Sequence, residues 1–150
     1  MTSRRNRTFI TRKLLSLCII IYATMNEKSR VLVVDDEPGI VKVLGIKLKL
    51  HGYDFIGTTS GAEAVELART RDPDVMLLDI LMPGMNGMEV LEKVRAFSKV
   101  PVIVFTARPD VTQIAMKMGA DAFIAKPFDP DQMLEKIQAV LSGNGKSPAA

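Results

Sequence analysis

Five strand-like apolar runs alternate with helix-like segments along most of this 150-residue chain. The runs lie near residues 31–35, 53–58, 74–79, 101–105 and 121–125. The first, third and fourth are continuous stretches of large apolar residues, which is typical of parallel strands covered on both faces. A chain in which strands and helices alternate with short connections is expected to form one parallel sheet with right-handed crossovers.

The helical segments have readable starts. Ser60 with Glu63, and Asn86 with Glu89, have the spacing of capping boxes, and Asp129 stands one residue before a proline. The expected helices cover residues 38–50, 60–71, 86–97, 111–118 and 129–141. These elements favour the α/β class, a flavodoxin-like doubly wound (βα)5 sheet with strand order 2-1-3-4-5.

Four of the apolar runs end in a charged or hydroxylated residue. Asp35 and Asp36 follow the first run, Asp79 the third, Thr106 the fourth and Lys126 the fifth. A parallel α/β sheet places its ligand site at the carboxyl ends of its strands. These side chains are therefore expected to meet at one edge of the sheet.

That set of groups suits a divalent cation and a phosphoryl group. Neighbouring carboxylates repel one another unless a cation lies between them, and oxygen ligands favour Mg²⁺, with Mn²⁺ as an alternative. Asp79 could act as a covalent nucleophile and form an aspartyl phosphate. Lys126 would neutralise charge on the transferred group, and the Thr106 hydroxyl could bond to one of its oxygens.

Residues 33–38, 79–87, 106–107 and 126–128 together resemble the receiver domain of two-component response regulators. The resemblance covers about residues 28–142 and is closest to single-domain regulators of the chemotaxis type. It implies that Asp79 accepts a phosphoryl group from a histidine kinase or a histidine phosphotransfer protein.

The resemblance also implies the metal ligands and the switch. Asp36 and Asp79 would bind Mg²⁺ together with the backbone carbonyl of Leu81, and Asp35 would act through water. Lys126 would hold the phosphoryl group, and its bond to the following proline is expected to be cis.

The expected switch couples Thr106 to Phe123. Phosphorylation would draw the Thr106 hydroxyl inward, and Phe123 would rotate into the vacated space. The face formed by the helix 111–118, the strand 121–125 and the helix 129–141 would then signal through protein contacts. A phosphorylation-dependent homodimer is a further implied partner.

Two departures from the family pattern bear on this expectation. The segment between Thr106 and Lys126 is short, so the sequence does not determine which face of the domain carries the output. Leu81 and Arg108 occupy positions that tune loss of phosphate in the family. Because Leu81 cannot orient an attacking water, we expect the phosphate to be lost slowly.

The first 24 residues differ from the rest. They carry five basic residues and no acidic one, so a chain with a net charge of +3 leaves −2 for the remainder. No direct nucleic-acid partner is therefore expected of the domain. The single cysteine, Cys18, allows no disulfide within the chain and fits a reducing, cytoplasmic location.

This leader also holds about ten apolar residues, 14–23, which are too few to span a bilayer. Its basic start resembles a signal peptide, but no small-residue cleavage site follows. The favoured interpretation is a dispensable or start-site extension, with a membrane-associating segment and a packed extra helix as alternatives. A membrane partner is expected only if the leader is native. The receiver domain is expected over 25–142 and a flexible tail over 143–150.

Three other functions fit the sequence less well than a signalling domain. An aspartate-nucleophile phosphatase has similar chemistry but uses a second aspartate where this chain has Leu81. A flavin-binding protein would need a phosphate-cradling loop after the first strand, where this chain has Asp36 and Glu37. A scaffold that is never phosphorylated would not need the full site. We therefore expect the chain to catalyse only its own phosphorylation and dephosphorylation. We also expect no output domain in this chain, and a protein as the downstream target.

Overall fold

The computed structural model describes residues 3–143, with side chains described for residues 11–22 and 27–143. All of the expected tail except Gly143 lies outside these residues. The elements, in chain order, are α1 (Ser3–Asn26), β1 (Arg30–Val34), α2 (Pro38–Leu50), β2 (Asp54–Thr58), α3 (Gly61–Thr70), β3 (Val75–Asp79), α4 (Gly87–Arg95), β4 (Val102–Thr106), a 3₁₀ turn (Pro109–Val111), α5 (Thr112–Lys117), β5 (Ala122–Ala125) and α6 (Pro130–Leu141).

The five strands form one parallel sheet in the order β2-β1-β3-β4-β5. This confirms the predicted fold class and strand order. β1 lies beside β3 with Val34 opposite Leu78, so the chain segments that follow these two strands emerge next to each other. The strands begin and end within one residue of the predicted bounds.

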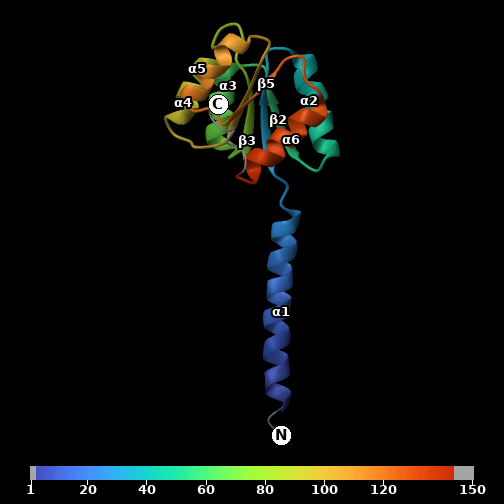
Figure 1. The fold of residues 1–150 in the computed structure, drawn as a ribbon. Helices are drawn as coiled ribbons and strands as arrows, with labels where there is room; N and C mark the ends of the chain where they lie inside the picture. The colour runs from blue at the N-terminus through green and yellow to red at the C-terminus, as the bar shows by residue number, and fades with distance from the viewer. Residues whose placement is uncertain (1–2, 144–150) are drawn as a thin grey trace.

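Helices cover both faces of the sheet (Figure 1). Because successive side chains along a strand point to opposite faces, each central strand contributes to the core on both sides of the sheet. Leu32 and Val34 of β1 belong to the core beneath α3, α4 and α5, whereas Val31 and Val33 belong to the core beneath α2 and α6. The central strands β3 and β4 are buried along their whole length, which explains their continuous apolar sequences.

Side chains cap three of the helices as their sequences predict. Ser60 accepts a hydrogen bond from the backbone N–H of Glu63, and Asn86 accepts one from Glu89. Asp129 accepts one from Asp131 at the start of α6.

The start of α4 lies very close to the end of β3. A β-carbon on Gly87 would lie 2.2 Å from the carbonyl oxygen of Asp79, which no side chain can tolerate. Gly84 in the connecting loop has a φ of +75°, a conformation that favours glycine. These two glycines let the loop after Asp79 turn tightly back over the sheet.

The segment after Thr106 is where the helix differs from expectation. In place of one helix over 111–118, a 3₁₀ turn beginning at Pro109 leads into α5, which spans only Thr112–Lys117. The guanidinium of Arg108 forms an ion pair with Asp110 within this turn. Proline lacks an N–H and fixes φ, which favours the tight turn over a longer helix.

The leader forms α1, which extends away from the layered domain (Figure 1). Residues 11–22 are exposed along their whole length. Within the part of the chain that the structure describes, no helix has the length and apolar character needed to cross a membrane.

Candidate functional site

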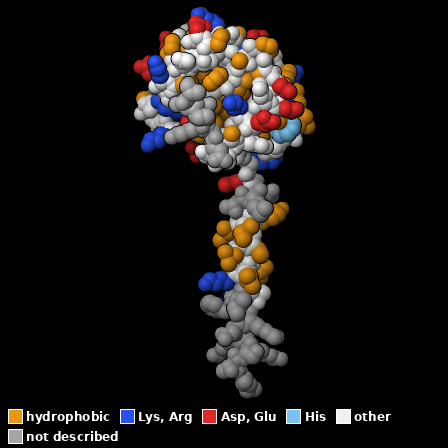
Figure 2. All heavy atoms as spheres, viewed as in Figure 1, with side chains coloured by type: hydrophobic (Ala, Val, Ile, Leu, Met, Phe, Trp, Pro, Cys, Tyr) orange, Lys and Arg blue, Asp and Glu red, His pale blue; other side chains and the backbone are white. Residues whose placement is uncertain are grey.

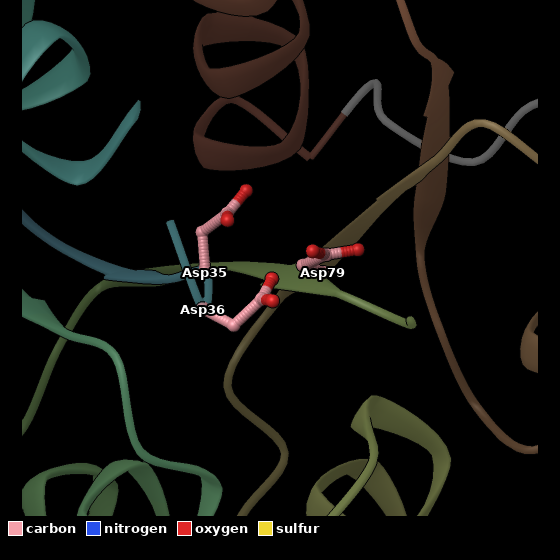
Figure 3. A group of neighbouring side chains, drawn as sticks. All are labelled: Asp35, Asp36 and Asp79. Carbon is pink, nitrogen blue, oxygen red and sulfur yellow. The ribbon is translucent and has the colours of Figure 1, made fainter. Parts of the chain in front are cut away.

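Three carboxyl groups gather where β1 and β3 end (Figure 3). Asp35 and Asp79 are buried, and Asp36 is half-buried. One oxygen from each lies within 4.8 Å of the others, so the three could share one cation. This juxtaposition follows from the fold, because β1 and β3 are parallel neighbours.

Lys126 supplies the opposite charge. Its Nζ lies 3.0 Å from Oδ2 of Asp35 and 3.3 Å from Oδ2 of Asp79. The same nitrogen lies 4.8 Å from the centre of the Phe105 ring, at the end of β4. The Lys126–Pro127 bond is cis, as predicted. The ammonium is thus held between two carboxylates and an aromatic face.

The other oxygens of the two buried carboxylates accept backbone hydrogen bonds. Oδ1 of Asp35 accepts one from the N–H of Glu37 at 2.8 Å, and Oδ1 of Asp79 accepts one from Leu81 at 3.1 Å. Both carboxylates are therefore held in fixed orientations by the chain that follows them.

The surroundings of the ion pair shift the pKa values of both Asp79 and Lys126. Burial raises the pKa of Asp79 to about 6, since the lowering by the Lys126 charge is opposed by the Asp35 charge. Burial lowers the pKa of Lys126, but the hydrogen bond to Asp35 and the charges of the two carboxylates outweigh it, so the net shift is upward. Lys126 is therefore positively charged at neutral pH.

The donor set fits a hard divalent cation. Asp35, Asp36 and Asp79 offer only oxygen atoms, which Mg²⁺ and Mn²⁺ prefer. Nitrogen and sulfur ligands are absent from this cluster, which disfavours zinc. The acidic cluster is thus able to hold a metal ion of the oxygen-binding class.

The Asp79 carboxylate lines a small cleft of about 230 Å³. The cleft is large enough for a phosphoryl group, and both acidic and basic residues line it. It is lined by Asp36, Glu37, Asp79, Leu81, Ala107 and Lys126. A wider and mostly apolar hollow of about 670 Å³ lies beside it between α2 and the β5–α6 loop, with Lys126 in the lining of both.

Thr106 and Phe123 do not line this cleft. Thr106 is buried at the end of β4, and its Oγ1 accepts a hydrogen bond from the N–H of Arg108 at 3.1 Å. Phe123 stands on β5 opposite Val104, and 40% of its surface is exposed. The structure thus brings the three aspartates and Lys126 together, with Leu81 at the rim and the two remaining predicted residues on the adjoining strands.

Sequence reasoning missed the role of Phe105. Its ring lies beneath the Lys126 ammonium and meets Phe128 edge-on at 5.8 Å. The only sequence signal is an aromatic residue directly before Thr106 in an otherwise aliphatic strand. A cation over an aromatic face is stabilised by the ring quadrupole, so Phe105 positions Lys126.

Comparisons with known proteins agree with this geometry. The family model described as the response regulator receiver domain matches residues 31–138. The DNA-binding response regulator MtrA of Mycolicibacterium smegmatis is 37% identical over 124 residues, covering 81% of this chain and 54% of that protein. The probable transcriptional regulator ycf27 of Guillardia theta is 38% identical over 125 residues, covering 82% and 49%. The chain therefore spans about half the length of these curated relatives.

Solved structures share the fold. A CheY-like response regulator receiver domain protein from Methanospirillum hungatei superimposes with a TM-score of 0.74 at 29% identity, covering 80% of this chain and 98% of that one. The BeF3-activated N-terminal receiver domain of Klebsiella pneumoniae RstA does so with a TM-score of 0.71 at 26% identity, covering 75% and 98%. From its sheet order, its acidic cluster and these matches, the chain belongs to the response regulator receiver domain family.

Proposed function

We propose that this domain accepts a phosphoryl group on Asp79 from a histidine kinase or a histidine phosphotransfer protein. The observation that carries the proposal is the ion pair at the mouth of the cleft, where the Asp79 carboxylate lies 3.3 Å from Lys126 Nζ. An aspartate oxygen next to a fixed ammonium can attack a phosphorus whose outer oxygens that ammonium neutralises.

In this reaction the nitrogen–phosphorus bond of the donor breaks as the bond from Asp79 to phosphorus forms. The imidazole leaves with the bonding electron pair and takes up a proton. Asp79 must be ionised to attack, and the Lys126 charge favours that ionised form. Phosphoryl transfer depends chiefly on positioning and electrostatics, which this site supplies.

We further propose Mg²⁺, with Mn²⁺ as an alternative, as the bound cation. Asp36, Asp79 and the Leu81 carbonyl would hold it directly, and Asp35 through water. Such an ion supplies charge neutralisation on the phosphoryl oxygens. The all-oxygen cluster within 4.8 Å supports this assignment.

The apolar hollow beside Lys126 suits the phosphate donor. Ile40, Val43 and Leu44 of α2 line one side of it, and Pro127 and Phe128 the other. A donor helix that packs its apolar side chains there would bring a phosphorylated histidine to the edge of the Asp79 cleft. Burial of such surface is the main favourable term in protein association.

Signal output would follow from Thr106. Its hydroxyl hydrogen can turn to a phosphoryl oxygen on Asp79, and Phe123 could then move from its exposed position into the space beside it. The face of α5, β5 and α6 would change and be recognised by a protein partner or a second copy of the domain. The DNA binding named for MtrA belongs to that protein, and we propose no direct nucleic-acid contact for this domain.

We propose that the chain catalyses only its own phosphorylation and dephosphorylation, within the cytoplasm. A hydrolase of this chemistry needs an acid near the nucleophile to protonate a leaving group. The residue two positions after Asp79 is Leu81, whose side chain is 44% exposed and cannot donate a proton.

The test is incubation of the full chain with acetyl phosphate and Mg²⁺, followed by intact-mass measurement. We expect one phosphoryl adduct in the wild type and none in Asp79→Asn. Asp54→Asn is the matched control, because Asp54 is an exposed aspartate on the edge strand β2 and should leave the adduct intact. An adduct that persists in Asp79→Asn, or no adduct with any donor, would refute the proposal.

A further inference from the structure

The described part of α1 presents a long apolar surface to solvent. Its seven large apolar side chains between Leu14 and Tyr22 are each 48–71% exposed. Figure 2 shows hydrophobic side chains over the described part of this helix, with basic atoms beside them toward its N-terminus. Covering this much exposed apolar surface would stabilise the helix, so the surface is expected to have a binding partner.

The charge of the segment is equally one-sided. Residues 1–24 contain Arg4, Arg5, Arg7, Arg12 and Lys13 and no acid, although the rest of the chain sums to −2. The surface that α1 binds should therefore carry negative charge on its outside and have an apolar interior below that layer.

Charge and apolar surface are separated along the helix axis. At about 100° per residue, Leu14, Leu17 and Ile21 lie on one side of the helix, and Leu15, Ile19 and Tyr22 lie on the other. The apolar side chains therefore surround the helix over residues 14–22, and the basic residues precede them in the chain. Basic residues next to exposed apolar surface are attracted to anionic lipid surfaces.

We propose that α1 binds the surface of an anionic lipid bilayer, tethering the receiver domain there. The apolar side chains would enter the boundary between headgroups and acyl chains, and the basic side chains would contact lipid phosphates. This inference goes beyond the proposed phosphoryl transfer and does not depend on it.

Two other arrangements fit the chain less well. A helix inserted end-on from the side of the domain would carry the basic N-terminal residues into hydrocarbon, which is costly. Self-association through the apolar residues of 14–22 would bring five positive charges of one copy next to five of another in a parallel pair. An anionic bilayer removes both difficulties because it neutralises the same charges.

The experiment is sedimentation of the full chain with vesicles of phosphatidylcholine alone or mixed with phosphatidylglycerol. We expect at least tenfold stronger partitioning onto the anionic vesicles, and weaker partitioning as salt rises. Arg12→Gln and Lys13→Gln should each lower the partition coefficient about fivefold. Leu17→Glu should abolish binding.

The matched control is Leu50→Glu. Leu50 is an apolar residue of α2 that is 77% exposed, so the same chemical change is made away from α1. It should leave lipid binding unchanged, and circular dichroism should show that every variant remains folded. Equal binding to both vesicle types, no binding to either, or a loss with Leu50→Glu equal to that with Leu17→Glu would overturn the proposal. The proposal would also be overturned if the wild type forms an oligomer in buffer and does not bind vesicles, and Leu17→Glu makes it monomeric.

Discussion

Asp79 is a buried carboxylate whose charged form is disfavoured in the folded protein. Its pKa is raised from 3.8 to about 6, with burial as the main cause and the Asp35 charge as a further one. Lys126 offsets this only in part. The features that would make Asp79 a reactive acceptor therefore cost stability when no cation is bound.

We predict that Asp79→Asn stabilises the metal-free protein above pH 6. Because the folded-state pKa exceeds the unfolded one, the folded state holds its proton more tightly. Ionisation of Asp79 therefore destabilises the fold as pH rises from about 4 to beyond 6. The gain at pH 8 should be on the order of 2 kcal/mol and should shrink at pH 4.5. Urea unfolding in EDTA measures it, and an equal effect at both pH values would contradict it.

Lys126 should matter more for stability than a lysine whose ion-pair partner is exposed. Lys126→Met leaves Asp35 and Asp79 buried without a counter-charge and should cost about 3 kcal/mol at pH 8 without metal. Lys47 is the control, because it lies 2.8 Å from the exposed Asp131. Lys47→Met should change the free energy of unfolding by less than about 1 kcal/mol. Similar losses from both substitutions would be inconsistent with a buried pair.

Leu81 lies where it would affect the loss of phosphate from the proposed acceptor, Asp79. Its side chain is apolar and 44% exposed at the rim of the cleft, so it offers no group to orient an attacking water. Leu81→Asn should shorten the half-life of the phosphorylated protein severalfold, as measured by the decay of the phosphoryl adduct. Leu50→Asn, at an exposed position far along α2, should not. An unchanged half-life for Leu81→Asn would count against this role.

At the scale of elements, the junction between β3 and α4 is the tightest part of the site. The N–H of Gly87 donates to the carbonyl of Ile80 at 3.0 Å, which draws the start of α4 onto the end of β3. The loop between them carries Leu81. The packing of one helix start therefore fixes the geometry of the cleft.

We predict that Gly87→Ala is strongly destabilising. Its β-carbon would collide with the backbone of Asp79 and Ile80, which cannot move independently of the sheet. The cost should be about 2 kcal/mol or more, and phosphorylation should slow. Gly39→Ala is the matched control, because beyond its chain neighbours and the backbone of its own helix no atom lies within 4 Å of its added carbon. That substitution within α2 should be neutral or stabilising by up to about 1 kcal/mol. Equal effects would argue against close packing at Gly87.

The elements that the sequence predicts well are those with local causes. β3 and β4 are continuous apolar runs, and α3 and α4 begin at side chains that cap them. The end of α4 was predicted less well, at residue 97 rather than Arg95. Arg95 donates hydrogen bonds to the carbonyls of Val100 and Gly119, and such distant partners leave no local signal.

The same distinction holds within the site. The aspartates and Lys126 could be placed in one group because each ends a strand and the strand order follows from the βα alternation. The contact between Lys126 and Phe105 could not, since it depends on how two side chains pack across neighbouring strands.

At the scale of the whole molecule, a bound cation should stabilise the domain. A ligand that binds only the folded state raises its stability by mass action, by about 2.7 kcal/mol at a concentration of 100 times Kd. Millimolar Mg²⁺ should therefore raise the unfolding temperature of the wild type by several degrees, which calorimetry can measure. Asp36→Asn removes one carboxylate of the cluster and should reduce this gain, whereas Asp54→Asn should not. A rise that survives in Asp36→Asn would place the ion elsewhere.

The ion pairs of Lys126 join residues that lie far apart along the chain. Asp35 lies 91 positions before this lysine, and Asp79 lies 47 positions before it. During synthesis both aspartates leave the ribosome well before the residue that balances their charge. A nascent or broken chain thus carries the proposed acceptor without its counter-charge. We therefore expect phosphoryl transfer only to molecules whose synthesis and folding have reached β5.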